Sequence, residues 1–299
     1  MPMISGAAKS RIEIFHEEYL SLASENEEAL LEIALSEIPE SVYNSNAIEK
    51  STLTLEDTED ILIRNEIRKD NVVKEIYEAK NLAEIMERLI KNTGKDFDVT
   101  DPEEIKRLHE ILFTRIDTTG AGRFRGGKEW VRVGAHLGAN PAYTNELVFE
   151  LVEKFNNDKE SYFLDKIAGF HAEFEMIHPF MNGNGRIGRA VVNGQLMRLG
   201  YPPIIIPNKS KQKEYLSLFD DYRKTGKSDG LSQLFALLLM ESMHKRIAII
   251  TSKKVIFVGE WAKECGLNIR SALNMAKKQR IPAFRLRGKW MIDEAYLKR

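Results

Sequence analysis

The feature that most constrains the fold of this chain is a series of stretches in which apolar residues recur every three to four positions. That spacing places the apolar side chains on one face of an α-helix. Clusters of glycine and proline separate the stretches, as is typical of turns between packed helices. The seven stretches are residues 12–36, 58–91, 101–115, 144–157, 158–177, 210–224 and 230–245. The sequence therefore predicts a mainly α-helical protein.

The composition agrees with a protein that buries a core. Of the 299 residues, 43% are hydrophobic and 30% are charged, which excludes collagen-like and fully disordered chains. The single cysteine, Cys265, cannot form an internal disulfide, so nothing indicates an oxidising compartment. No apolar run reaches the roughly 18 residues of a membrane span, and residues 1–11 contain no hydrophobic signal core. We therefore expect a cytoplasmic protein with no membrane partner.

One segment between the helices has the pattern of strands. Residues 129–137 contain Trp130, Val131, Val133 and Leu137 among turn residues, with glycines on both sides. Aromatic and β-branched residues bounded by glycines favour short strands. We expect a small β-hairpin on the helical body.

The end of the chain differs in charge from the rest. Residues 252–299 contain twelve lysines and arginines and four acidic residues, a net charge of +8, whereas the whole chain carries −1. This asymmetry predicts a separate C-terminal module with an anionic partner, joined through a hinge at residues 251–254.

Two glycine-rich segments match nucleotide-binding patterns without the structural context that those patterns need. Residues 122–129 (GRFRGGKE) nearly match a P-loop, but Glu129 lacks the hydroxyl that coordinates magnesium, and no buried strand leads into the segment. Residues 183–188 (GNGRIG) match the dinucleotide-binding pattern, but a loop containing Pro179 precedes them. Neither segment predicts a P-loop or a Rossmann site.

His171, Glu175 and His178 lie on one face of a predicted helix, and two interpretations of this spacing are open. The three side chains can be ligands of a transition metal. Alternatively, His171 packs in the core with Glu175 as a hydrogen-bond partner. Pro179 disfavours helix at His178 and so weakens the metal interpretation.

Residues 178–189 (HPFMNGNGRIGR) carry the densest chemistry in the chain. One helix ends at His178, a glycine-rich turn follows, and a new helix starts near Gly185. The glycines permit a tight turn whose N–H groups face an anion at the N-terminus of the new helix. Arg186 and Arg189 lie on one face of its first turn and can hold two successive phosphates. The segment predicts a polyphosphate cradle with a histidine at its edge.

This segment resembles the signature of the Fic (Fic/Doc) family, H-x-F-x-[DE]-G-N-G-R-x-x-R, and departs from it only at Asn182. The resemblance extends over about residues 45–243. It implies a mainly α, Fic-type helical core with a small β-hairpin flap, and a packing role for His171 and Glu175. The matching segments outside the signature are residues 122–125 (an arginine-containing turn), 131–136 (the flap) and 200–207.

The resemblance implies an enzyme that transfers AMP from ATP to a Ser, Thr or Tyr hydroxyl of a target protein and releases pyrophosphate. His178 would be the general base, a role that suits an imidazole because its unperturbed pKa lies near neutrality. Phe180 would anchor the loop, and the flap would hold an extended target segment by strand addition. The residues implied to contact ATP are Glu49, Val133, Gly134, Ala135, His136, Asn182, Gly183, Asn184, Gly185, Arg186, Ile187, Gly188, Arg189 and Tyr215.

Asn182 replaces the family carboxylate that coordinates magnesium. An amide oxygen can still be a ligand but brings no charge, so the affinity for Mg²⁺ should fall. Two interpretations are open: a working transferase with weakened metal binding, or an altered nucleotide chemistry. The rest of the loop is intact, which favours the first.

Upstream, residues 45–49 resemble the inhibitory helix of a Fic subclass, [ST]-x-x-x-E-[GN]. Ser45 and Glu49 are one helical turn apart and face the same way. The resemblance implies that Glu49 pairs with Arg189 and keeps the γ-phosphate out of a productive position. Lys50 departs from the expected Gly or Asn, which puts the strength of inhibition in question. Residues 52–55 extend the resemblance.

The basic C-terminal segment predicts a helix and turn at residues 258–266, a second helix at residues 268–278, and a hairpin that turns at Gly288. This order resembles a winged helix-turn-helix of the excisionase or MerR type, which places its second helix in a DNA groove. The positive charge agrees with phosphate contacts. A small protein-docking module with a basic surface explains the segment equally well.

We therefore expect three parts: an N-terminal helical region with the inhibitory helix (1–100), a Fic catalytic core (101–250) and a winged helix-turn-helix-like module (251–299). The expected function is protein adenylylation with ATP and Mg²⁺, self-inhibited by Glu49. The target can be another protein or the chain itself, a homodimer is one expectation for the assembly, and the tail can bind DNA. Removal of AMP at the same site, and a DNA-binding regulator whose Fic domain senses nucleotide, remain alternatives.

Overall fold

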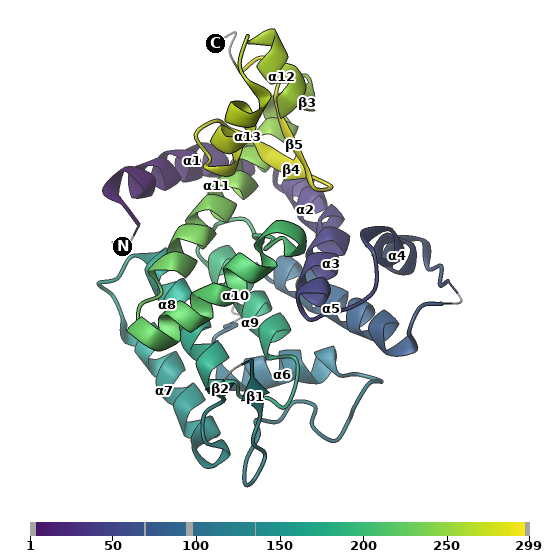
Figure 1. Ribbon diagram of the computed structural model, residues 1–299, viewed down its shortest axis with the longest axis vertical. Helices are drawn as coiled ribbons and strands as arrows, with labels where there is room; N and C mark the ends of the chain where they lie inside the picture. Colours follow the sequence, from purple (N-terminus) through teal and green to yellow (C-terminus); the bar gives the residue numbers. More distant parts are fainter. Residues whose placement is uncertain (1–3, 69, 94–97, 135, 297–299) are drawn as a thin grey trace.

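The computed structural model describes residues 4–68, 70–93, 98–134 and 136–296, and the expected ATP contact of Ala135 lies outside them. Within these ranges the chain is mainly helical, as the apolar spacing predicts (Figure 1). The α-helices are α1 (Gly6–Glu25), α2 (Glu27–Ser36), α3 (Ile38–Ile48), α4 (Leu55–Glu59), α5 (Val73–Lys91), α6 (Pro102–Leu112), α7 (Thr144–Asn157), α8 (Phe163–Ile177), α9 (Asn184–Arg198), α10 (Asn208–Thr225), α11 (Asp229–Thr251), α12 (Val258–Glu264) and α13 (Ile269–Lys277).

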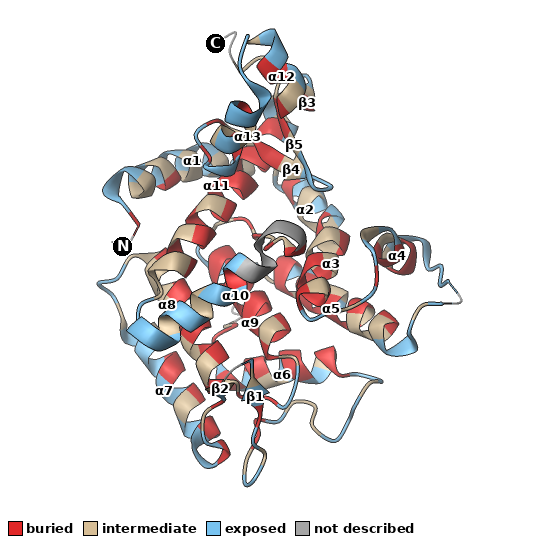
Figure 2. Ribbon diagram, viewed as in Figure 1, coloured by how far each residue is buried: buried red, intermediate tan, exposed pale blue. Residues whose placement is uncertain are grey.

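Helix α9 lies at the centre of the body and positions the glycine-rich loop. It packs against α3, α5, α6 and α8, and its residues are buried on nearly every side (Figure 2). A helix that is buried all round belongs to the core rather than to the surface. The loop that precedes α9 is therefore held between helices that come from distant parts of the sequence.

Two of the expected helical stretches are interrupted. Residues 12–36 form two helices, because the chain breaks at Asn26, whose side chain donates to the carbonyl of Leu22. Residues 58–91 form the end of α4, a π-helical turn (Asp60–Arg64) and, after a loop, α5. Asn65 follows the π-turn in the left-handed conformation, with φ 56°, which stops the helix.

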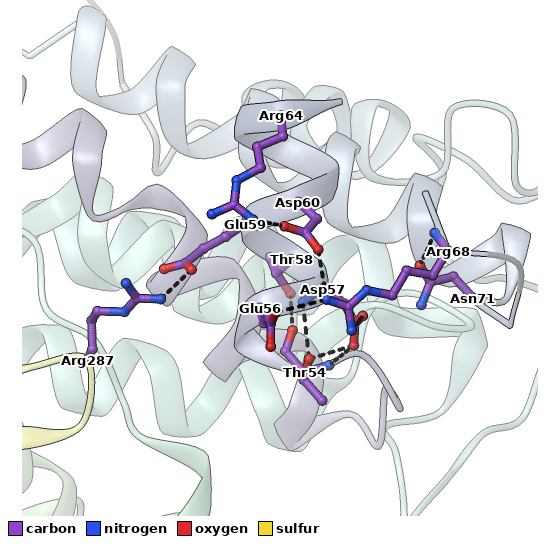
Figure 3. A network of polar contacts seen from close by, with 10 residues as sticks. All are labelled: Thr54, Glu56, Asp57, Thr58, Glu59, Asp60, Arg64, Arg68, Asn71 and Arg287. Atoms are coloured by element: carbon purple, nitrogen blue, oxygen red, sulfur yellow. Dashed lines mark hydrogen bonds and ion pairs between the residues drawn. The ribbon is translucent and has the colours of Figure 1, made fainter. Parts of the chain in front are cut away.

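A polar network fixes the short helix α4 and ties it to the C-terminal segment (Figure 3). Thr54 and Asp57 form a reciprocal capping box at the start of α4. The guanidinium of Arg68 folds back onto the carboxylate of Asp57, at 3.2 Å. Arg287, from the C-terminal hairpin, pairs with Glu59. Residues 54–68, which follow α3, are therefore held by this network and by the C-terminal hairpin.

The strands form two small antiparallel sheets. The predicted hairpin consists of β1 (Arg132–Val133) and β2 (His136–Leu137), in which Val133 is the partner of His136. In the C-terminal segment, β3 (Val255–Phe257), β4 (Phe284–Leu286) and β5 (Lys289–Asp293) follow the order β3-β5-β4. Figure 1 shows the two sheets near opposite ends of the long axis.

The C-terminal segment, residues 252–296, has its own small core around Trp261 and Ile292. It also contacts the body, because Arg285 pairs with Glu241 of α11 and Gln279 with His244. Helix α11 runs on to Thr251, six residues beyond the expected end. Across the part of the chain that the structure describes, we find no helix with the length and apolar content to span a membrane.

Candidate active site

His178 ends helix α8 and begins the glycine-rich loop. It has a left-handed backbone, with φ 54° and ψ 62°, and its N–H donates to the carbonyl of Phe174 at 2.9 Å. The left-handed residue turns the chain sharply, as C-terminal caps of helices do. The imidazole is 18% exposed. Burial lowers its pKa to about 4, so the ring is neutral near pH 7 and able to accept a proton.

Arg125 holds the backbone around His178. Its guanidinium is only 2% exposed and donates to four carbonyls, including those of Ile177 at 2.8 Å and His178 at 2.6 Å. The other acceptors are the carbonyls of Glu129 and Ala139, before and after the β1–β2 hairpin. Arg125 is therefore a structural link between the hairpin and the histidine, and its donors are not directed at a ligand.

Phe180 and His109 fix the middle of the loop. Phe180 is fully buried and stacks on His109, with the ring centroids 3.7 Å apart. The N–H of Gly122 donates to Nδ1 of His109, which leaves Nε2 to donate to the carbonyl of Asn182 at 3.1 Å. The backbone of Asn182 is therefore held, while the residue is exposed. Burial lowers the pKa of His109 to about 4 and so preserves this neutral, bifunctional form.

The loop ends at Gly183, where α9 begins. Gly183 has φ 78°, and a β-carbon there would lie 2.8 Å from the ring of Phe113, so only glycine fits. Asn184 closes the turn by bonding both the N–H and the carbonyl of Phe180, each at 2.8 Å. These contacts leave the first N–H groups of α9 at the loop, where a helix N-terminus favours an anion.

Glu49, from the end of α3, lies at this N-terminus. Its Oε1 accepts from Arg189 at 2.9 Å, and Arg189 also donates to the hydroxyl and the carbonyl of Ser45, each at 2.9 Å. A β-carbon on Gly185 would collide with the Glu49 carboxylate. Partial burial alone would raise the pKa of Glu49, but the positive charges of Arg189 and, less strongly, of Arg186 outweigh this effect and hold the pKa below its usual range. A carboxylate therefore lies in the position where the loop favours an anion.

The other arginine at the start of α9, Arg186, also has an acidic partner. Its Nη1 lies 2.9 Å from Oε1 of Glu78 on α5, and both side chains are largely buried. The Arg186 Nε–H lacks a hydrogen-bond partner among the described residues. Glu78 is a site residue that sequence reasoning missed, because nothing in the spacing of α5 indicates which distant cation its acidic residues meet.

The two interpretations of His171 and Glu175 can now be compared. Nε2 of His171 lies 2.6 Å from the hydroxyl of Tyr215, and the side chains of His171, Glu175 and Tyr215 are all buried. The described part of the chain contains no group of three or more His, Cys, Asp or Glu residues that could hold a metal ion. The structure therefore agrees with a packing role for His171, but its hydrogen-bond partner is Tyr215 and not Glu175, because Nδ1 of His171 and Oε1 of Glu175 make no hydrogen bond with the described residues. The pKa of Glu175 is raised by burial to about 8, and its Oε2 lies 3.7 Å from Nδ1 of His178.

The remaining expected ATP contacts divide into two groups. Ile187 and Gly188 are buried within α9, and Tyr215 is 1% exposed, so these residues support the loop from the core side. Val133, Gly134 and His136 lie in the β1–β2 hairpin. The hairpin reaches the loop through Gly138, where a β-carbon would lie 3.2 Å from Cβ of His178.

The chain matches known proteins over its helical body. Residues 99–196 match the model of the Fic/DOC family. Protein adenylyltransferase Fic of Drosophila melanogaster is 32% identical over 177 residues, which cover 58% of this chain and 35% of that protein. Protein adenylyltransferase fic-1 of Caenorhabditis elegans is 30% identical over 181 residues, which cover 59% and 35%. The match therefore spans about a third of the length of these relatives.

Two solved structures share the fold. A Fic-domain-containing signaling protein from Bacteroides thetaiotaomicron superposes with a TM-score of 0.68 at 22% identity, and the match covers 79% of this chain and 95% of that one. A Fic family protein from Desulfovibrio desulfuricans has a TM-score of 0.65 at 17% identity, and the match covers 97% of both chains. The fold is thus the mainly helical Fic type with small antiparallel sheets. Over residues 99–196 the chain thus matches the Fic/DOC family model, and it is similar in sequence to the Fic protein adenylyltransferases.

Proposed function

We propose that this protein transfers AMP from ATP to a hydroxyl of a target protein. One observation carries the proposal: a neutral histidine at the edge of a glycine-rich loop faces a helix N-terminus that holds two arginines. The relatives named protein adenylyltransferases support the same reaction. In this reaction the target oxygen bonds to the α-phosphorus as the bond from that phosphorus to pyrophosphate breaks.

Each part of the loop has a role in the proposed reaction. His178 takes the proton of the attacking hydroxyl. The N–H groups at the start of α9 hold phosphate oxygens, and Arg186 and Arg189 neutralise the charge that grows on the leaving pyrophosphate. The β1–β2 hairpin, which Arg125 ties to His178, holds an extended target segment by strand addition.

Magnesium would contact the protein through Asn182 only weakly. The Asn182 carbonyl accepts from His109, so the side-chain oxygen is the group left for an ion. One uncharged oxygen fits a metal held mainly by the nucleotide phosphates and by water, which is a binding mode that Mg²⁺ commonly adopts. When bound, the ion would supply positive charge at the phosphates.

We also propose that Glu49 inhibits the transferase in cis. Its carboxylate takes the Arg189 guanidinium and the space next to Gly185, both of which a γ-phosphate would need. Lys50 ends α3 in the left-handed conformation, with φ 70°, where glycine would be unstrained. We therefore expect the strain at Lys50 to weaken the inhibitory contact of Glu49.

Removal of AMP at the same site is the second candidate. The carboxylate of Glu49 lies close enough to influence the charge of both His178 and Arg189. From this position it could orient a water molecule for attack on the phosphorus of a modified target. Addition and removal would then share His178, and Glu49 would oppose the first and be needed for the second.

For the C-terminal segment we propose a protein-docking role over duplex DNA binding. Arg270, Asn274, Lys277 and Lys278 are exposed, and the last three also line a cavity of about 770 Å³ between this segment and the helical body. If α13 were to enter the major groove of DNA, that side of the helix would have to be accessible to the duplex. A partner of these three side chains must fit beside the helical body, and that position favours a protein segment over the width of a duplex.

The test of the main proposal is incubation with ATP labelled at the α- or the γ-phosphate, together with a lysate of candidate targets. We expect α-label on protein and none from γ-labelled ATP. His178→Ala should abolish the transfer and leave ATP binding largely intact. Protein labelled from the γ-phosphate would contradict the proposal and indicate a kinase reaction.

A further inference from the structure

Glu175 is a buried carboxyl group directly behind His178, and the proposed reaction does not yet use it. The residue is 8% exposed and lies three positions before His178 on α8. Its Oε2 is 3.7 Å from Nδ1 of His178, and its backbone carbonyl is 3.4 Å from the same nitrogen. The Nδ1 side of the imidazole therefore meets Glu175.

The other oxygen of this carboxyl group, Oε1, lacks a hydrogen-bond partner among the described residues. Gly188 of α9 packs against it, and a β-carbon there would lie 3.0 Å from Oε1. A buried polar atom without a partner costs free energy, so such an atom suggests a role. The carboxyl can also turn toward Nδ1 without breaking a hydrogen bond of its own.

We propose that Glu175 receives a proton from Nδ1 of His178 when Nε2 of His178 takes the proton of the target hydroxyl. The inference rests on the proposed AMP transfer. Glu175 is a positioning residue rather than a catalytic one, because it acts only through His178. Closing the 3.7 Å separation to an ordinary hydrogen bond requires a shift of less than about 1 Å.

The proton transfer balances within the pair. The target O–H bond breaks as Nε2–H forms, and Nδ1–H breaks as Oε2–H forms. The target oxygen keeps its electron pair and bonds to the α-phosphorus. His178 ends neutral with its proton on Nε2, and Glu175 ends as a neutral acid. After product release, Nε2 gives its proton to water and Glu175 returns its proton to Nδ1.

The charges around the pair favour this direction of transfer. Burial raises the pKa of Glu175 to about 8, and the neighbouring Glu49 adds to the effect while Arg189 opposes it. Burial lowers the pKa of His178 to about 4, and Arg125 and His136 lower it too. The hydrogen bond to the backbone carbonyl of Glu175 and, less strongly, the charge of Glu49 oppose this shift. Because the pKa of Glu175 is the higher of the two, a proton that enters the pair comes to rest on the carboxyl group.

This order of pKa values predicts an unusual pH dependence. His178 is neutral above about pH 4, so a histidine acting alone would give a flat profile at higher pH. Glu175 can accept a proton only when it is ionised, so kcat/KM of the wild-type protein should rise with pH until about 8. The position of this rise separates the two mechanisms.

The experiment compares the pH profiles of kcat/KM for AMP transfer in the full chain and in Glu175→Gln. We expect the substitution to lower kcat/KM about 10- to 100-fold above pH 8. The deficit should shrink toward pH 6, because the wild type loses its ionised carboxylate there. Glu175→Asp should restore part of the rise. Glu173→Gln is the matched control on the same helix, since Glu173 bonds to Tyr222 and not to His178.

A merely structural role for Glu175 would lower the rate equally at every pH, and that result would overturn the inference. A second measurement needs no activity: a titration of the ¹³C-labelled Glu175 carboxyl by NMR. We expect its midpoint near pH 8. A midpoint near the ordinary 4.5 refutes the role of Glu175 alone, whereas absence of α-label transfer in every variant refutes the proposed function as well.

Discussion

Replacing Glu49 by glycine should tighten ATP binding, because the carboxylate and the γ-phosphate compete for Arg189. The contact that is lost is one hydrogen bond of 2.9 Å from Nη2 of Arg189 to Oε1 of Glu49. The Glu49 side chain is 39% exposed, so solvent screens the pair and its free energy lies well below that of a buried ion pair. A charge-assisted contact in this setting is worth about 1–1.5 kcal/mol.

That free energy sets the expected change in affinity. If the contact favours the closed arrangement by ~1–1.5 kcal/mol, Arg189 is free in only about one molecule in six to one in fourteen. Glu49→Gly makes it free in all of them, so the dissociation constant for ATP should fall about six- to fourteenfold. The contacts of Arg189 with Ser45 stay in place and keep the guanidinium oriented.

The assay is isothermal titration with an ATP analogue that cannot lose its terminal phosphates. Glu49→Gln removes the charge and keeps the shape, and should give a smaller gain. Glu40→Gly is the matched control, since Glu40 lies on the same helix and faces Lys245. Adding Arg189→Ala to Glu49→Gly should cancel the gain. An unchanged affinity in Glu49→Gly would show that residues 45–49 are an ordinary packed helix.

Four further predictions follow from single contacts. Arg125→Ala should lower the free energy of unfolding by at least ~3 kcal/mol in urea titrations, because buried carbonyls lose their donor; a loss as small as that of exposed Arg123→Ala would contradict the linking role. Lys50→Gly should raise stability by about 0.5–1 kcal/mol, seen as a higher Tm, because it relieves a left-handed backbone; a lower Tm would count against this strain. Asn182→Asp should lower the Mg²⁺ concentration for half-maximal activity, and an unchanged requirement would mean that the side chain does not meet the ion. His109 has a folded-state pKa of about 4, below its ordinary 6.5, so the unfolded chain binds a proton that the folded chain excludes. The free energy of unfolding should therefore fall as the pH drops from 6.5 to 4. A smaller pH dependence in His109→Gln would confirm that His109 causes this fall.

The helical core and the loop were predictable because both depend on local patterns. Apolar spacing predicted the helix of residues 144–157 with the bounds that the structure has. The run from His178 to Arg189 predicted the end of one helix and the start of the next within one residue. Structure of this kind depends on residues that are close in the sequence, so the sequence alone is enough to predict it.

Contacts between distant segments were harder to predict. Glu78 meets Arg186 only because α5 and α9 pack side by side, and no spacing in either helix indicates the pair. The left-handed break at Asn65 was also missed, because the apolar spacing continues through it. Arg125 lies in a turn that resembles a family segment, but its four carbonyl acceptors come from parts of the chain that meet only in the folded protein.

The measurement that tests the central claim most directly is the transfer of α-labelled phosphate from ATP to protein by Glu49→Gly, with and without His178→Ala. In Glu49→Gly the Arg189 guanidinium is released from the carboxylate and His178 is intact, so this variant should label protein faster than the wild type. Adding His178→Ala should remove the label while ATP binding, followed by titration, stays within about threefold, a change of less than 1 kcal/mol. Equal labelling with and without His178 would contradict the account, because the loop would then transfer AMP without its base.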